Sequence, residues 1–367
     1  MKKSFKYRLK PTKEQIIKFE STLVLCCNLY NAALQERSEA YKLRHISLSA
    51  FDQMKELSGL KIECQEFHSV YSQILLDVII RVDKAFQAFF SRCQNKKQPG
   101  YPRFRNNARY DSFTYPQFGF SIREKSIVLS KIGEIRCIFH RLVEGKVKTC
   151  TIKREINEWY VVFSCDLVPE KHLQRTGEEI GIDVGLENFA ALSNGEMIAN
   201  PRHAKRAKAK LRRVLRKLSR CKHGSNRRKK QVIRVARQHL KVKRQRRDFH
   251  LKIAAELVKR FDVIHFEQLN IRGMVRNKRL AFSISDAGWY GFQQIVIGKA
   301  EEAGRLVTLN NARNSSNECS VSGEIVKKKL SQRFHVLPNG EKIHRDHNAA
   351  IVILRRGQRR QSVTVDL

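Results

Sequence analysis

The chain has 367 residues, of which 41% are hydrophobic and 29% charged, so it is long enough for two or three domains with sizeable buried cores. It carries 73 Lys and Arg against 35 Asp and Glu, a formal net charge of +38, and self-repulsion of this size makes nucleic acid the expected partner and a membrane a weaker one. No apolar run reaches transmembrane length and the nine cysteines lack framework spacing, which argues against a membrane protein and a disulfide-rich secreted protein and favours the cytoplasm, beside the nucleoid.

The N-terminus shows no signal peptide. Its first ten residues alternate basic with apolar or aromatic side chains, which predicts a strand that ends at Pro11. Apolar residues then recur at helical spacing, so residues 13–93 are expected to form a small helical bundle. The basic side chains of the strand are candidates for nucleic-acid contacts: Lys2, Lys3, Lys6, Arg8 and Lys10.

A basic loop with interleaved aromatics, KKQPGYPRFRNNARYDSF, covers residues 96–113. Cations that hold phosphate beside rings that stack on bases suit a nucleic-acid surface, and a Pro/Gly linker is an equally good interpretation. The candidate contacts in the loop are Tyr101, Arg103, Phe104 and Arg105.

Short strand patterns separated by turns follow in residues 114–168. Together with the N-terminal strand they would make a small β-barrel, interrupted in sequence by the helical bundle.

Two basic amphipathic helices are expected between residues 203 and 247. From Arg202 to Arg247 there are 22 Lys or Arg and no Asp or Glu. A solvated helix face normally mixes charges, because like charges four residues apart repel, so this hairpin requires an external anion such as a phosphate backbone. Its candidate contacts are Lys210, Arg212, Arg213, Arg216, Arg228, Lys229 and Lys230.

Three acidic residues accompany strongly apolar runs. Asp183 lies near the end of IGIDVG, Glu267 ends FDVIHFEQLN, and Asp346 precedes the apolar run in HRDHNAAIVIL. Each alone could be a helix cap or a surface pair, and for Asp346 capping is the better interpretation when that segment is taken alone. Brought together they would repel one another unless a cation lay between them, and Mg²⁺ prefers such oxygen ligands. Nucleases commonly hold two ions roughly 3.5–4 Å apart.

The order of these features resembles the TnpB family, OrfB-type RNA-guided DNA endonucleases encoded by transposons and related to compact type V CRISPR effectors. The resemblance spans nearly the whole chain, through FKYRLKPTKEQ, QPGYPRF, IGEIRCIFHR, GIDVGLENFAALSNGE, FEQLNIRGM and RDHNAA. It implies Asp183, Glu267 and Asp346 as the catalytic acids and Mg²⁺ ligands, with Arg345 and Asn348 supporting them.

The resemblance also implies an α+β multidomain fold. Residues 1–12 and 114–170 would form a wedge-like β-barrel, and 13–113 a helical recognition domain with the basic loop. Residues 178–310 and 346–367 would form a mixed α/β, RuvC-like (RNase H-like) nuclease domain, with 203–247 as its basic helical hairpin. Residues 311–345 would be a degenerate zinc knuckle that binds target nucleic acid.

The chain departs from the family pattern in two places. Relatives often carry two CxxC pairs between the second and third acids, whereas here Cys319 is the only matched ligand, and Ser322, Val336 and Asn339 occupy the other positions. A structural zinc site needs four N or S donors, so no zinc is expected, although His335 or His344 could substitute. His344 also stands where the family commonly has Asp.

The expected activity is Mg²⁺-dependent cleavage of double-stranded target DNA beside a short flanking motif, directed by a transposon-derived (omega-like) guide RNA. A monomer with one guide RNA is the expected assembly. An RNA-guided repressor that binds without cutting, a CRISPR type V effector and an unguided transposase remain alternatives. The intact acids argue against the repressor, and the barrel and QPGYPRF region argue against the unguided transposase.

Overall fold

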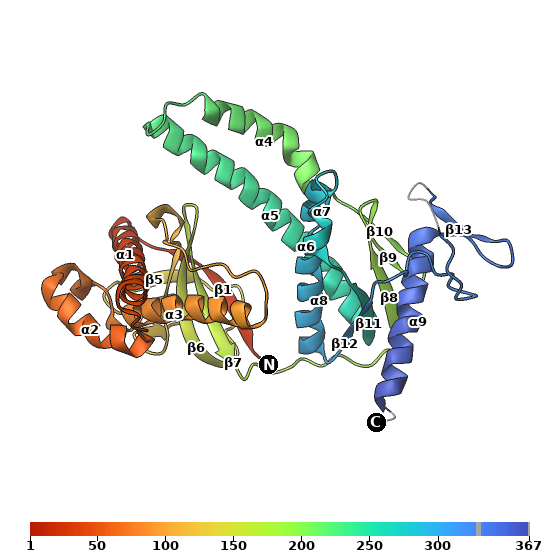
Figure 1. Cartoon of the computed structure of the whole chain (residues 1–367), viewed down its shortest axis with the longest axis horizontal. Helices are drawn as coiled ribbons and strands as arrows, with labels where there is room; N and C mark the ends of the chain where they lie inside the picture. The colour runs from red at the N-terminus through yellow and green to blue at the C-terminus, as the bar shows by residue number, and fades with distance from the viewer. Residues whose placement is uncertain (328–331, 366–367) are drawn as a thin grey trace. The chain divides into compact units, whose positions relative to one another are not determined.

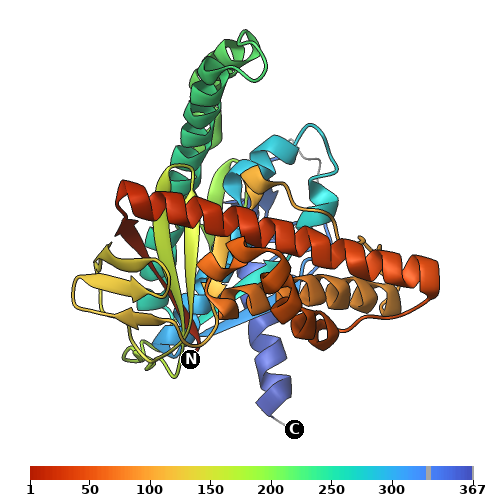
Figure 2. The same ribbon diagram turned by 90° about the vertical axis from the view of Figure 1, so that its left-hand side faces the viewer.

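The computed structural model describes residues 1–327 and 332–365. The chain divides into two compact units, which we call unit 1 (Met1–Pro169) and unit 2 (from Glu170), and their elements are shown in Figures 1 and 2. All nine cysteines are free thiols. Among the described residues, no helix is long and apolar enough to cross a membrane.

Unit 1 combines three α-helices with a seven-stranded antiparallel sheet of order β2-β6-β7-β1-β5-β4-β3. In chain order its elements are β1 (Lys3–Lys10), α1 (Lys13–Arg44), α2 (Ala50–Glu63), η1 (Gln65–Ser69), α3 (Ser72–Gln94), η2 (Asn107–Arg109), β2 (Ser112–Tyr115), β3 (Phe120–Ile122), β4 (Ser126–Leu129), β5 (Gly133–Ile138), β6 (Lys146–Glu155) and β7 (Glu158–Asp166).

The sheet of unit 1 is not a hydrogen-bonded barrel. Its order leaves β2 and β3 as edge strands, with no ladder between them in the described chain, so the expected closed barrel is not found. Side chains connect the two ends instead: the ring of Tyr115 on β2 lies 6.5 Å from that of Phe120 on β3, and its hydroxyl donates to the carbonyl of Ser130. These aromatic contacts bring the two edges of the sheet together, although no backbone hydrogen bonds join β2 to β3 in the described chain.

The helices of unit 1 pack on this sheet through apolar residues. Helix α1 begins with a capping box, in which Thr12 and Gln15 satisfy each other's backbone N–H groups. Its Phe19 ring lies 4.6 Å from Trp159 on β7 and 5.8 Å from Phe113 on β2. The long helix can be followed across the strands in Figure 2. The apolar residues that recur at helical spacing in residues 13–93 therefore contribute to the core of unit 1.

Unit 2 is built on a mixed five-stranded sheet of order β10-β9-β8-β11-β12. Strands β8, β11 and β12 are parallel, and β9 and β10 extend the sheet antiparallel. In chain order the elements are β8 (Glu179–Val184), β9 (Asn188–Leu192), β10 (Met197–Ala199), α4 (His203–Ser219), α5 (Asn226–Arg260), β11 (Val263–Gln268), α6 (Ile271–Met274), α7 (Ala281–Ala287), α8 (Trp289–Ala303), β12 (Leu306–Asn311), β13 (Phe334–Val336), β14 (Lys342–His344) and α9 (Arg345–Val365).

The two faces of the unit 2 sheet have different partners, α5 and α8 on one side and α9 on the other (Figure 1). Ile180, Ile182, Ile264 and Phe266 share a buried cluster with residues of α5 and α8. Because side chains alternate along a strand, the intervening residues of β8 and β11 face α9. Helix α9 therefore covers the face on which Asp183 and Glu267 lie.

Two glycines allow α9 to lie very close to the sheet. A Cβ on Gly181 of β8 would lie 2.2 Å from the carbonyl oxygen of Ala350, and one on Gly357 of α9 would lie 2.0 Å from Nδ1 of His265. Real Cβ atoms do not approach other atoms so closely, so a larger residue at Gly181 requires a shift of the helix, and one at Gly357 requires a shift of the helix or of the buried His265 ring. The approach brings the start of α9 beside the end of β8.

Candidate active site

The register of the sheet makes Asp183 and Glu267 neighbours. Strands β8 and β11 are parallel, with Ile182 opposite Phe266, so the next residue on each strand is an acid. Neighbouring strands lie roughly 4.8 Å apart, and paired residues point to the same face. Both carboxylates are therefore on the α9 side, at the carboxyl ends of adjacent parallel strands.

Helix α9 adds Asp346 to this edge. One carboxylate oxygen of Asp346 lies 3.9 Å from where a Cβ on Gly185 would stand, two residues beyond Asp183. The helix begins at Arg345, and the Asp346 backbone N–H donates to Nδ1 of His344 at 3.3 Å. His344 thus provides the cap, and the Asp346 carboxylate is left for another role.

Burial is the largest influence on the charge of these acids, and for Asp183 the repulsion of its acidic neighbours adds to it. Burial raises the pKa of Asp183 well above its usual range, and the negative charges of Glu267 and Asp346 raise it further, while Arg345 opposes them. The Arg345 guanidinium also donates to Asp346 at 3.3 Å and 3.4 Å. Without a cation, Asp183 is therefore driven toward its protonated form.

Glu267 is 6% exposed, and its Oε1 has no hydrogen-bond partner within the described structure. Burial raises its pKa, and a hydrogen bond from Ser315 and the charge of Arg356 lower it in part. A buried carboxylate oxygen without a partner is costly. Within residues 1–327 and 332–365, however, no group of three or more His, Cys, Asp or Glu side chains is placed to hold a metal ion.

Asn348 holds the segment that contains Cys319. The Asn348 side chain is fully buried, donates to the carbonyl of Glu318 at 2.7 Å and accepts from the N–H of Ser320 at 2.9 Å. Arg355, further along α9, donates to the Ser320 carbonyl. Asn348 thus positions the Glu318–Ser320 segment against α9. It lies within one helical turn of the Arg345–Asp346 pair.

The predicted knuckle segment, residues 311–345, contains among its described residues a tight turn around Cys319 and the β13–β14 hairpin. Cys319 is buried, its N–H donates to the carbonyl of Glu324 and its own carbonyl accepts from the N–H of Gly323. Ser322, at the second matched zinc position, accepts from the N–H of Glu324. Val336 ends β13, and Asn339 lies in the turn before β14. Residues 328–331 of the predicted segment lie outside the described residues.

The basic residues of the N-terminal strand are partly neutralised within unit 1. Lys6 pairs with Glu155 at 2.5 Å and Arg8 with Glu158 at 2.7 Å. Lys3 lies over the ring of Phe5. Lys2 and Lys10, at the two ends of the strand, are exposed. Lys6 and Arg8 would have to exchange an internal partner for a phosphate.

The basic loop of unit 1 borders a cavity of about 270 Å³, lined in part by Arg81, Arg105, Arg109 and Tyr110. The Arg105 guanidinium lies over the ring of Tyr30, and its backbone is bonded to Asn31. Of the other predicted contacts, Tyr101 packs against Phe86 and Phe89 while Arg103 and Phe104 are exposed.

The basic hairpin is formed by α4 and α5 (Figure 1). Helix α5 continues to Arg260, well beyond the expected end at residue 247. Arg228 is half-buried and donates to the carbonyls of Leu218 and Cys221 at the turn. The remaining predicted contacts are exposed: Lys210, Arg212, Arg213, Arg216, Lys229 and Lys230.

A fourth acid in unit 2, Asp286, has no counterpart among the residues predicted from the sequence. Asp286 is 8% exposed, and its carboxylate accepts from the N–H groups of Ala204 and Lys205 at the start of α4. The Arg246 side chain lies 3.5 Å away. Asp286 therefore fixes the first turn of the basic hairpin, a role that only the tertiary structure reveals.

Comparison with protein families gives three matches along the chain. Residues 162–278 match a family described as a probable transposase, and residues 289–353 match the Cas12f1-like TNB domain. Residues 1–45 match a helix-turn-helix domain, although here they form strand β1 and the single continuous helix α1.

Relatives match over most of the chain. A Streptomyces pristinaespiralis protein named "Putative RNA-guided DNA endonuclease" is 32% identical over 97% of this chain and 90% of its own length. A similarly named Escherichia coli K12 protein, InsQ, is 27% identical over 96% and 92%. The TnpB-like protein L79 of Acanthamoeba polyphaga mimivirus is 25% identical over 57% and 43%.

Two solved structures share the fold. A Cas12f1–sgRNA–target DNA complex superposes with a TM-score of 0.59 at 15% identity, over 93% of this chain and 83% of that one. The mini-RNA-guided endonuclease Cas_phi3 gives 0.53 at 9% identity, over 97% and 92%. Fold and relatives together define a class of compact RNA-guided nucleases. Within that class, the chain belongs to the TnpB family of transposon-encoded RNA-guided DNA endonucleases.

Proposed function

We propose that this protein is an RNA-guided DNA endonuclease that takes a guide RNA from its own transposon's transcript and cuts target DNA beside a short flanking motif. The observation that carries the proposal is the placement of Asp183 and Glu267 on one face of the sheet, with Asp346 at the start of the helix that covers that face. A chain that only bound DNA would have no use for three mutually repelling acids at this edge.

The nuclease domain in this proposal is RuvC-like and consists of residues 178–310 and 346–367, with 203–247 as the basic hairpin. Residues 1–12 and 114–170 act as a wedge-like element, and 13–113 as the recognition domain that grips RNA and flanking duplex. Residues 311–345 contact the target strand. This division is supported by the exposed basic residues of the hairpin and the basic cavity of unit 1.

The donor set fits a hard divalent cation. Three carboxylates supply only oxygen ligands, Oε1 of Glu267 has no partner in the described structure, and the repulsion on Asp183 would be relieved by positive charge. Asp183, Glu267 and Asp346 would hold Mg²⁺, which in a two-ion site activates water and stabilises the leaving phosphate oxygen. Arg345 orients Asp346, and Asn348 anchors the start of α9 to the Glu318–Ser320 segment.

We further propose that the Cys319 segment holds no zinc. Helix α9 supplies hydrogen bonds where relatives would use a metal, through Asn348, Arg355 and Arg356, the last of which pairs with Glu318 at 2.5 Å. Metal analysis of the purified protein tests this, and stoichiometric zinc would contradict it.

Replacement of Asp346 tests the function. With guide RNA and Mg²⁺, Asp346→Ala should lower cleavage of a matched plasmid at least ~100-fold, since even outer-shell partners of a metal cost 10–100-fold. Binding of guide RNA and target should remain within a few fold of the unmodified protein, because the carboxylate contributes no positive charge to phosphate binding. Absence of cleavage by the unmodified protein, or equal loss of binding and cutting in the variant, would refute the proposal.

A further inference from the structure

A basic groove in unit 2 lies beside the candidate acids. Two cavities of about 430 Å³ and about 400 Å³ share Glu187, Asn200, Arg202 and Lys205 as lining residues, so they adjoin and are treated together as one hollow. We call this hollow the α4 groove. Arg206 lines one end of it, and Phe282, Asp286 and Arg333 line the other.

The walls of the α4 groove are close along the chain to two of the acids, Asp183 at the end of β8 and Asp346 at the start of α9. Glu187 follows Asp183 by four residues, in the turn between β8 and β9. The carbonyl of Arg333 accepts the N–H of Arg345 at 2.8 Å, next to Asp346. An ion pair of 2.8 Å between Glu187 and Arg333 joins these two walls. A strand that reaches the acids would have the groove as its neighbouring surface.

The acids in the groove already have partners, whereas its main cations do not. Glu187 is paired with Arg333, and Asp286 accepts from the first turn of α4. In the described part of the chain, no acidic side chain pairs with Arg202, Lys205 or Arg206. Arg202 reaches only the Glu187 carbonyl, at 3.4 Å. Three exposed cations within five residues therefore lack a counterion.

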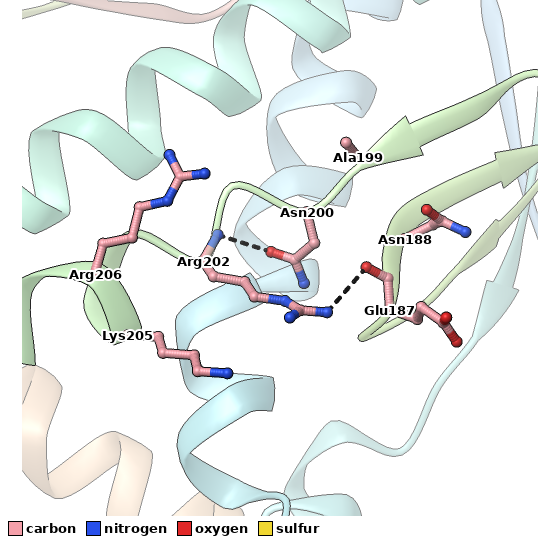
Figure 3. Close-up of a pocket in the computed structure, with 7 residues that line it drawn as sticks. All are labelled: Glu187, Asn188, Ala199, Asn200, Arg202, Lys205 and Arg206. Carbon is pink, nitrogen blue, oxygen red and sulfur yellow. Dashed lines mark hydrogen bonds between the residues drawn. The ribbon is translucent and has the colours of Figure 1, made fainter.

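The backbone fixes where these cations lie. Arg202 has a positive φ of 48°, which is uncommon for a residue with a side chain. The Asn200 side chain holds this turn, because it accepts from the Arg202 N–H at 3.1 Å and donates to the Leu186 carbonyl at 3.0 Å. Figure 3 shows Arg202 extended toward Glu187, with Lys205 and Arg206 following from the first turn of α4. The cations are thus presented from a fixed turn.

An aromatic side chain completes the site. Phe282 on α7 lines the groove and is 50% exposed, and the Lys208 ammonium lies 5.7 Å from its ring centroid. Fixed cations beside an accessible ring are the combination that binds single-stranded nucleic acid, since the cations follow the backbone and the ring stacks on a base.

We propose that the α4 groove binds the phosphate backbone of the DNA strand being cut, next to the scissile bond. Arg202, Lys205 and Arg206 contact consecutive phosphates, and Phe282 stacks on a base. The strand is DNA because, in the proposed function, DNA is the substrate whose phosphate is delivered to the acids. This inference rests on the proposed nuclease function.

A charge-removal experiment on the complete protein–guide complex tests the groove. The triple variant R202Q/K205Q/R206Q should bind guide RNA normally and bind target, measured without divalent ions, within about threefold. Its single-turnover cleavage in Mg²⁺ should fall 10–100-fold. A matched control, K252Q/K259Q/K299Q, removes the same charge from α5 and α8 outside the groove and should cleave like the unmodified protein.

Neutral DNA linkages identify the contacts. A methylphosphonate placed one or two phosphates from the cut should slow the unmodified protein but add little to the defect of the triple variant, because the same contact is already lost. Fully multiplicative effects would overturn the proposal, as would triple-variant cleavage at the control rate. Loss of guide-RNA binding would also overturn it by assigning the groove to RNA.

Failure of the unmodified protein to cut would count against the nuclease function and thereby against the groove. Should the triple variant fail to fold, Lys205→Gln alone leaves the Asn200–Arg202 turn intact and carries the same comparison. Its cleavage rate should fall severalfold and respond less to the neutral linkage, and unchanged values for both would overturn the proposal.

Discussion

At the scale of single residues, the candidate site is a place where the fold tolerates an unfavourable arrangement. Asp183 and Glu267 are adjacent on parallel strands and both have a raised pKa, for which burial is the first cause. A sheet chosen for stability alone would place apolar residues there. A bound cation would offset the free-energy cost of burying these carboxylates. This expectation can be tested through protein stability, without measuring cleavage.

Asp183→Asn should therefore stabilise the metal-free protein while abolishing cleavage. The folded pKa of Asp183 lies above its unfolded value, so stability is lost as the pH rises from about 4 through the folded pKa. Asparagine carries no charge at any pH and escapes this loss. In EDTA at pH 7.5 the variant should melt at a higher temperature than the unmodified protein.

Magnesium should favour the unmodified protein over Asp183→Asn. A ligand that binds only the folded state raises stability in proportion to ln(1 + [L]/Kd), so 10 mM MgCl₂ should raise the Tm of the unmodified protein more than that of Asp183→Asn. Equal shifts with Mg²⁺, or a lower Tm for the variant in EDTA, would show that these acids do not form a cation site.

At the scale of elements, α9 assembles the site by lying close to β8. The close approach depends on Gly181 and Gly357, and the alternation along β8 and β11 then turns both acids toward the helix. The register of these strands and the start of one helix, rather than any loop, thus position residues 183, 267 and 346 of the candidate site.

Gly181→Ala tests this dependence. The new methyl group would lie 2.2 Å from the Ala350 carbonyl, so α9 must move, and overpacking of this kind typically costs ~1–3 kcal/mol. Because a misplacement of about 1 Å can cost about 100-fold in rate, cleavage should fall by more than tenfold even where the variant is fully folded.

Gly298→Ala is the matched control for that substitution. Gly298 lies in α8, and no atom of its surroundings lies within 4 Å of the position that a Cβ would take. Alanine there should raise stability by ~0.5–1 kcal/mol through helix propensity and leave cleavage unchanged. Equal cleavage by the two variants would mean that the α9 contact does not position Asp346.

The sequence predicted the acids better than their surroundings. Strand patterns and apolar runs predicted the elements that carry Asp183, Glu267 and Asp346, now β8, β11 and α9, because alternation and helix periodicity are local signals; the catalytic role of the three acids stays a prediction. Asp286 and the α4 groove depend on contacts between residues about 80 positions apart, which no local pattern encodes. The prediction of a closed barrel was wrong for a similar reason, since strand patterns do not indicate whether the two edge strands pair with each other.

At the scale of the whole molecule, the two units should respond differently to acid. Burial lowers the pKa of His203, His250 and His265, and all three lie in unit 2. For His250 the pKa falls to about 4 because the ring is buried, and the hydrogen bond that its Nε2–H donates to the Ala287 carbonyl at 2.9 Å only partly opposes this fall. Asp183 and Glu267 have the opposite effect on stability in acid, because their raised pKa values favour proton uptake by the folded state.

His250→Gln separates these opposing effects. Between pH 6.5 and about 4 the unfolded chain gains a proton on His250 that the folded unit does not take up, so the unmodified protein loses stability as the pH falls, by ~3 kcal/mol at about 1.4 kcal/mol per pKa unit. The variant lacks this loss but retains Asp183 and Glu267. The variant should unfold more easily at pH 7.5, since it loses the buried ring. The difference between the unfolding free energies of unit 2 in the two proteins should narrow steadily toward pH 4.5. Chemical denaturation followed by hydrogen exchange measures this difference. A gap that stays constant over this range would mean that His250 is protonated inside the fold, and that its buried contact with Ala287 is not the neutral hydrogen bond described here.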